Sequence, residues 1–134
     1  MVDNFNSANR HILVIDDDEL LSEAVKTVLS REGYKITVAN NARTGIDIAI
    51  KTQPDLILMD ISMPEMDGYE ATELLKKIPE LKLIPVVYLT GKTAAEDGGK
   101  AFETGGVSFM CKPFSNQQLR DVVSFAIQSV ESID

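Results

Sequence analysis

Residues 55–68 read Asp55-Leu56-Ile57-Leu58-Met59-Asp60-Ile61-Ser62-Met63-Pro64-Glu65-Met66-Asp67-Gly68. The four apolar residues 56–59 have the pattern of a strand that is covered on both faces. Pro64 and the Asp67-Gly68 pair are turn residues, so the backbone is expected to change direction soon after the strand. Asp60 therefore stands where a buried strand ends.

Polar side chains also follow three other apolar runs. They are Asp16 and Asp17 after residues 12–15, Thr90 after residues 86–89, and Lys112 after residues 109–111. If the strands are parallel, their carboxyl ends share one edge of the sheet, which is where ligands bind in open α/β sheets. We therefore predict a functional site at this edge, built from residues that are far apart in the chain.

The composition is that of an ordinary globular domain. The chain has 134 residues, of which 44% are hydrophobic and 25% charged, and this argues against wholesale disorder. No apolar run approaches the roughly 18 residues of a membrane span, and residues 1–10 lack the apolar centre of a signal peptide. We expect a flexible leader at residues 1–10, one domain at residues 11–131, and a cytoplasmic protein without membrane contact.

Charge and cysteine content narrow the function classes further. The formal net charge of −8 argues against direct binding to nucleic acid, because such binding depends on cations that neutralise phosphates. It favours metal ions or basic partner surfaces instead. Cys111 is the only cysteine, so an intrachain disulfide cannot form, and we expect Cys111 to be a small buried residue of a strand.

Strand and helix patterns alternate along the chain. Strands are predicted at residues 11–15, 34–39, 56–60, 84–89 and 107–111, and helices at about 18–32, from the Asn40-Asn41 cap to Pro54, and at about 69–77, 93–104 and 115–130. The helix at 93–104 is the weakest, because Gly98 and Gly99 each cost about 1 kcal/mol relative to alanine. We expect this helix to be short or mobile.

This alternation predicts an α/β fold, namely a doubly wound five-stranded parallel sheet with five helices on its two faces. If the first and third strands are neighbours, the strand order is 2-1-3-4-5, which is the flavodoxin-like order. The crevice at the switch point of such a sheet then falls between the Asp16-Asp17 pair and Asp60. Topology and side-chain chemistry select the same edge.

Three carboxylates that converge within a few ångströms repel one another, and the pKa of at least one of them rises unless a cation is present. Mg2+ is the ion that suits a small set of carboxylate and carbonyl oxygens, and the chain has no clustered His or Cys that would recruit zinc. The run Asp16-Asp17-Asp18 is also compatible with a simple turn and helix cap. The similar placement of Asp60 favours the metal site.

Thr90 and Lys112 discriminate between the uses of such a metal site. An ammonium and a hydroxyl beside a carboxylate and Mg2+ form a pocket for phosphoryl oxygens. In that pocket Asp60 would act as a nucleophile that forms an aspartyl phosphate. The residues therefore predict phosphoryl transfer.

The motifs at these strand ends are specific in combination. They are Val14-Ile15-Asp16-Asp17-Asp18, residues 58–68, Leu89-Thr90-Gly91 and Cys111-Lys112-Pro113-Phe114. With them, the chain resembles the receiver domains of bacterial two-component response regulators, including the single-domain chemotaxis type. The resemblance covers roughly residues 11–130.

The resemblance implies a role for each site residue. Asp60 would accept phosphate from a histidine kinase or a histidine phosphotransfer protein. Asp17, Asp60 and the backbone carbonyl of Ser62 would bind Mg2+ directly, and Asp16 would act largely through water. Thr90 and Lys112 would hold the phosphoryl group. The bond Lys112-Pro113 is a candidate for the cis form.

The resemblance also implies a switch rather than a conventional enzyme, one that supports its own phosphorylation and dephosphorylation. When Thr90 is drawn toward the phosphoryl oxygens, Phe109 would rotate into the space it leaves. Phe109 stands where this family often has tyrosine, and it lacks the hydroxyl that could bond the loop after Thr90. The output surface would be the fourth helix, fifth strand and fifth helix, which would bind a downstream protein target or an output domain of a longer chain.

Three alternatives remain open from the sequence. A flavodoxin-like electron carrier needs a phosphate loop rich in hydroxyls and glycines after the first strand, where this chain has acids. An acid-nucleophile phosphatase favours a second acid two residues after the nucleophile, where this chain has Ser62. A degenerate receiver that acts only as an interaction module would not need the complete set of site residues.

Overall fold

The computed structural model describes residues 10–91 and 94–131. Strands and helices alternate in the order β1(His11–Ile15), α1(Glu19–Arg31), β2(Lys35–Ala39), α2(Ala42–Thr52), β3(Leu56–Asp60), α3(Gly68–Lys76), the short 3-10 helix η2(Pro79–Leu81), β4(Val86–Thr90), α4(Ala94–Glu103), β5(Ser108–Cys111) and α5(Asn116–Glu131). All but Arg10 of the predicted leader, and Thr93 of the predicted fourth helix, lie outside the described residues.

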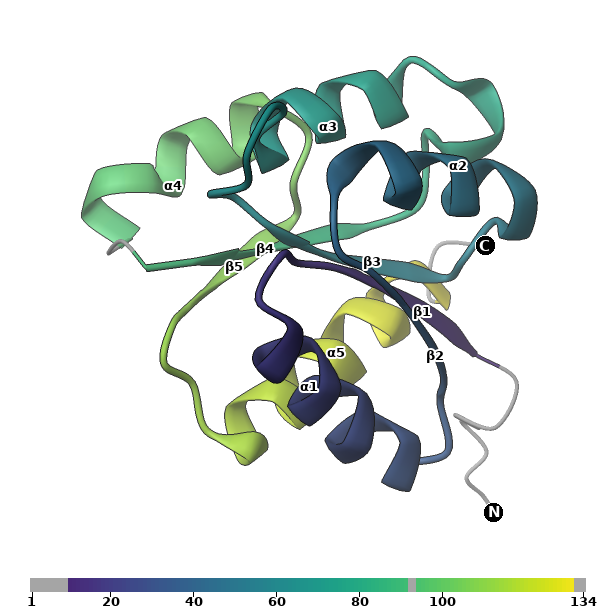
Figure 1. Cartoon of the computed structure of the whole chain (residues 1–134), viewed down its shortest axis with the longest axis vertical. Coiled ribbons are helices and arrows are strands. Elements are labelled where there is room, and N and C mark those ends of the chain that lie inside the picture. The colour runs from purple at the N-terminus through teal and green to yellow at the C-terminus, as the bar shows by residue number, and fades with distance from the viewer. Residues whose placement is uncertain (1–9, 92–93, 132–134) are drawn as a thin grey trace.

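The five strands form one parallel sheet in the order β2-β1-β3-β4-β5. Figure 1 shows α2, α3 and α4 on one face of this sheet and α1 and α5 on the other. The predicted flavodoxin-like α/β fold with five helices is therefore confirmed. The direction in which successive strands are added to the sheet reverses at β1, because β2 lies on one side of β1 and β3, β4 and β5 follow on the other. The crevice of the sheet therefore opens beside the carboxyl ends of β1 and β3.

Two apolar cores lie on the two faces of the sheet. Alternate residues of each central strand point to opposite faces, so Leu13 and Ile57 join one core while Ile12 and Leu56 join the other. In the first core the helices contribute Ala49, Ala71, Leu75 and Ala101, and in the second they contribute Val25, Leu29, Leu119 and Val123. Every residue of β3 is buried, which confirms that the apolar run before Asp60 is a central strand.

Local sequence signals explain where the helices near the site begin. Asp18 is the N-cap of α1 and accepts a hydrogen bond from the backbone N–H of Leu21. Asp67 is the N-cap of α3 and forms a reciprocal capping box with Glu70. These caps satisfy backbone donors that a helix leaves free at its first turn, and they hold the loops after β1 and β3 in place.

Cys111 differs from what the sequence predicts, and the structure shows how far the helix α4 extends. Cys111 is exposed rather than buried; it is the last residue of β5, which is an edge strand of the sheet, whereas Met110 before it is buried in the core on the α1 and α5 side. The helix α4 extends from Ala94 to Glu103, so its two glycines do not interrupt it. Its expected mobility remains a prediction.

No helix in the part of the chain that the structure describes combines the length and the apolarity needed to span a lipid bilayer.

Candidate functional site

Three carboxylates converge at the carboxyl edge of the sheet. Asp16 and Asp17 follow β1, and Asp60 is the last residue of β3. One oxygen from each of the three lies within 4.8 Å of the others. The strands β1 and β3 are paired, with Ile15 opposite Met59, so their ends must lie side by side. The structure thus brings together the acidic residues that the sequence predicts as a cluster.

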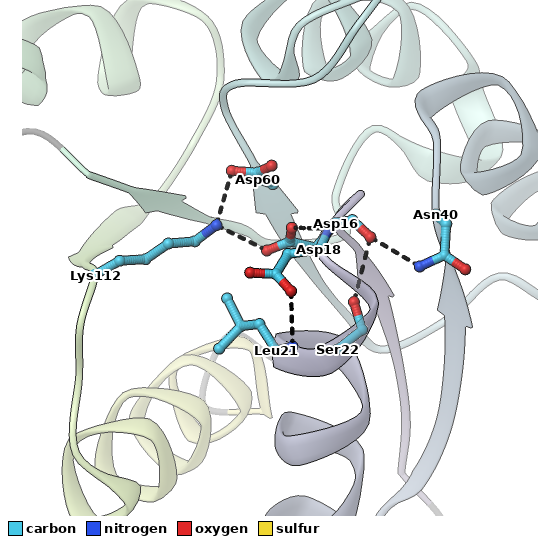
Figure 2. A network of polar contacts seen from close by, with 7 residues as sticks. All are labelled: Asp16, Asp18, Leu21, Ser22, Asn40, Asp60 and Lys112. Carbon is cyan, nitrogen blue, oxygen red and sulfur yellow. Dashed lines mark hydrogen bonds and ion pairs between the residues drawn. The ribbon is translucent and has the colours of Figure 1, made fainter.

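Lys112 reaches this cluster from β5, on the far side of β4. Its ammonium nitrogen lies 3.1 Å from Oδ1 of Asp60 and 3.0 Å from Oδ2 of Asp16. Figure 2 shows the extended lysine side chain ending between the two carboxylates. The backbone N–H of Lys112 also donates to the carbonyl of Thr90 at 2.6 Å. The following peptide bond, Lys112-Pro113, is cis.

Asp16 is the most deeply buried of the three carboxylates, with no exposed surface, and the loop around it is tightly bonded. Its Oδ1 accepts from the backbone N–H of Asp18 at 2.9 Å. Its backbone carbonyl accepts from the Ser22 hydroxyl at 3.2 Å and from the Asn40 amide at 3.0 Å (Figure 2). These bonds hold the aspartates after β1 in one orientation.

The supporting role of Asn40 was missed by sequence reasoning, which placed it with Asn41 in a helix cap. The structure assigns the cap to Asn41 alone, whose side chain accepts from the backbone N–H of Thr44 at 2.8 Å. Asn40 instead reaches across to the loop after β1, which is distant in sequence. A paired-asparagine motif gives no signal for this division of roles.

Gly68 allows α3 to approach the end of β3 closely. A Cβ atom on this residue would lie 2.3 Å from the backbone carbonyl oxygen of Asp60. The backbone N–H of Gly68 donates to the carbonyl of Ile61 at 2.9 Å, which closes the turn after β3. A side chain here would therefore displace the residue at the centre of the cluster.

The electrostatic environment makes Asp60 a hard group to ionise when no cation is bound. Burial, and after it the nearby charge of Asp16, raise its pKa from 3.8 to about 7, even though the Lys112 ammonium acts in the opposite direction. Burial by itself would lower the pKa of Lys112, but its bonds to Asp16 and Asp60 and their charges raise it overall. The cluster has more negative charge than one lysine balances.

A divalent cation fits this arrangement of donors. The three converging side chains offer only carboxylate oxygens, the ligands that Mg2+ prefers. Asp17 is exposed while Asp16 and Asp60 are buried, so the cluster opens to solvent on one side. Ser62, the fourth predicted ligand, is exposed two residues after Asp60. The acidic pocket formed by Asp16, Asp17 and Asp60 could therefore hold a metal ion.

Thr90 and Phe109 are on the neighbouring strands β4 and β5. Thr90 ends β4, is 3% exposed, and is in register with Cys111 of β5, one residue before Lys112. Phe109 is in register with Tyr88, is partly buried and packs against the core beneath α3 and α4. Because side chains two residues apart share a face of a strand, Thr90 and Phe109 are on the same side of the sheet.

Comparisons with curated proteins identify relatives of this chain. The chain is 34% identical over 113 residues to a probable transcriptional regulator, ycf29, of Porphyra purpurea, and the match covers 84% of this chain and 54% of that protein. The chain thus spans about half the length of the first curated relatives that it matches.

Solved structures of receiver domains and of a chemotaxis protein are similar to this chain. The receiver domain of a signal transduction histidine kinase from Syntrophus aciditrophicus superimposes with a TM-score of 0.83 and 33% identity, covering 93% of this chain and 95% of that one. Chemotaxis protein CheY4 of Vibrio cholerae does so with a TM-score of 0.85 and 26% identity, covering 89% and 99%. The family model of the response regulator receiver domain matches residues 12–124. The chain therefore belongs to the response regulator receiver domain family of two-component signalling systems.

Proposed function

We propose that Asp60 accepts a phosphoryl group from a histidine kinase or a histidine phosphotransfer protein. The observation that carries this proposal is the position of the Asp60 carboxylate, which is 4% exposed, lies among converging acids, and contacts the Lys112 ammonium at 3.1 Å. The Lys112 ammonium contacts both buried acids, so it is placed to stabilise negative charge first on the Asp60 carboxylate and then on a phosphoryl oxygen. An ion pair with a purely structural role would not need Asp17, the third and exposed acid.

In this proposal the ionised Oδ of Asp60 attacks the phosphorus of a phosphohistidine. The new bond is P–O, the broken bond is P–N, and the electron pair stays on the departing imidazole nitrogen, which takes a proton from solvent. Asp17, Asp60 and the backbone carbonyl of Ser62 would hold Mg2+ directly, and Asp16 would act through water. The bound Mg2+ would supply positive charge that stabilises the phosphoryl oxygens. Lys112 and Thr90 would donate hydrogen bonds to the phosphoryl oxygens.

The same proposal includes a conformational output. Thr90 would move toward the phosphoryl oxygens, and Phe109 would turn into the space beside it, on the same face of the sheet. This movement would change the surface formed by α4, β5 and α5. The surface would bind a downstream protein or an output domain, and the net charge of −8 disfavours direct contact with nucleic acid. Such a domain acts as a cytoplasmic signalling switch whose substrate is its own aspartate.

Labelling with a small phosphodonor tests the proposal. Acetyl phosphate with Mg2+ should add one phosphoryl group to the parent protein, measured as a mass increase, and chelation by EDTA should abolish the addition. The variant Asp60→Asn should not be labelled, whereas Asp47→Asn, which changes an exposed aspartate of α2, should be labelled like the parent. Equal labelling of Asp60→Asn and the parent would remove Asp60 from this role.

A further inference from the structure

An apolar groove lies at the opposite end of the sheet from the acidic cluster. It has a volume of about 760 Å³ and is bounded by α5, by the segment that joins α3 to β4, and by the start of β5. Pro85, Val107 and Ser108 place it at the amino ends of β4 and β5. No described residue of α4 lines it, but residues of β5 and α5 do, so the groove borders the surface that α4 forms with β5 and α5.

The rims of the groove carry large apolar side chains that face solvent. Leu83 is 87% exposed, Phe125 is 72% exposed and Val107 is 49% exposed. A small molecule inside the groove would leave the outer parts of these side chains in water. A protein surface that lies over the groove would cover them, and the removal of their apolar area from water would favour binding. The exposed rims therefore favour a macromolecular occupant.

The two rims of the groove carry side chains of opposite charge. Lys82 is exposed on the rim between α3 and β4, and Asp121 is exposed on the α5 rim, where its carboxylate accepts from the neutral amide of Gln117 at 2.8 Å. Lys76 is engaged inside the molecule, since its ammonium donates to the carbonyls of Lys82 and Ile84 at 3.1 and 2.6 Å. One exposed cation and one exposed anion thus stand on opposite rims.

This arrangement is self-complementary under two-fold symmetry. If the axis runs along the groove, each α5 rim faces the α3–β4 rim of the other molecule. Asp121 of each copy then meets Lys82 of the other, and each Phe125 faces the α3–β4 rim of the partner. The chain as a whole has a net charge of −8, so two copies repel each other over most of their surface. A patch with balanced charge is where they can approach.

We propose that this groove is the contact surface of a symmetric dimer of this chain, with Phe125 as its apolar anchor and the Asp121–Lys82 pair setting its register. The groove lies at the end of the sheet remote from Asp60, so the unphosphorylated protein should already form the dimer. Accordingly, Asp60→Asn should dimerise with the same dissociation constant as the parent.

Sedimentation equilibrium over a range of protein concentrations tests the apolar anchor. The parent should show a monomer–dimer equilibrium, and Phe125→Glu should raise its dissociation constant by about tenfold or more. The matched control is Phe102→Glu, which alters an equally apolar residue that is 62% exposed on α4, and which should dimerise like the parent. A parent that stays monomeric at every concentration, or equal effects of the two variants, overturns the proposal.

Charge reversal tests the symmetry itself. Asp121→Lys alone and Lys82→Glu alone should each be monomeric, because every homodimer would bring two like-charge pairs together. An equimolar mixture of these two variants should form dimers, because both pairs are then opposite in charge. The double variant Asp121→Lys/Lys82→Glu should also dimerise. Failure of the mixture and of the double variant to recover dimers overturns the two-fold pairing, with folding of each variant checked by circular dichroism.

Discussion

Replacing Asp60 by asparagine should stabilise the Mg2+-free protein, and the gain should depend on pH. In the folded state burial and the charge of Asp16 raise the pKa of Asp60 from 3.8 to about 7. A raised pKa means that the folded protein binds this proton more tightly than the unfolded chain does. The free energy of unfolding of the parent protein therefore falls as pH rises from about 4 to 7, because the folded protein loses a proton that it binds more tightly than the unfolded chain does. Asparagine has nearly the same shape and never ionises.

The size of the effect follows from the same pKa values. At 1.36 kcal/mol for each pKa unit, a rise from 3.8 to about 7 lowers the stability of the parent by about 4 kcal/mol above pH 7. Near pH 4 the carboxylate is mostly protonated in the folded state, and the difference falls below about 1 kcal/mol. Asp60→Asn should therefore be more stable than the parent by about 4 kcal/mol at pH 8.5 and by less than about 1 kcal/mol at pH 4.

Urea unfolding of both proteins in EDTA, repeated at pH values from 4 to 8.5, measures this difference. Saturating Mg2+ should reduce the advantage of Asp60→Asn at pH 8.5, because the cation compensates the charge of the parent site. The control variant Asp47→Asn, which alters an exposed aspartate, should follow the parent at every pH. Equal stability of Asp60→Asn and the parent at pH 8.5, or a difference that is the same at all pH values, would refute the reasoning.

Two other predictions concern α4. Tyr88→Phe should destabilise the protein by about 1 kcal/mol, because the Tyr88 hydroxyl is buried and lies 2.6 Å from the Thr104 hydroxyl, directly after this helix. Urea unfolding measures the change, and an unchanged free energy of unfolding would count against this hydrogen bond. If phosphorylation switches the α4, β5 and α5 surface, beryllofluoride with Mg2+ should alter hydrogen exchange over residues 91–106; unchanged exchange there would argue against α4 as part of the output.

The predictions that succeeded from sequence rest on local patterns. Four apolar residues before Asp60 identify a central strand, and the Asp67-Gly68 turn signal marks where the following loop ends and α3 begins. These signals act over one to four residues, so the sequence records them directly. The alternation of strands and helices then restricts the topology, because parallel strands with right-handed crossovers bring their carboxyl ends to one edge. The acidic cluster follows from that edge.

Exposure was harder to predict than secondary structure. Cys111 is in a strand, as expected, but it is exposed at the end of β5, which is the last strand of the sheet. Leu20 has the spacing of an apolar helix face, yet it is 86% exposed at the start of α1. Whether an apolar position is buried depends on which element packs against it, and periodicity carries no information on that neighbour.

The sequence by itself determined the residue types at the ends of the strands, the positions of the helices, and so the presence of an acidic edge with one lysine and one threonine. Only the tertiary structure decided that Asp16 is the deepest acid, that Lys112 bridges it to Asp60, and that Asn40 supports the first loop. The bond between Lys112 and Asp60 joins residues 52 positions apart. Such contacts depend on strand order and register, which are set by the packing of the whole sheet rather than by neighbouring residues.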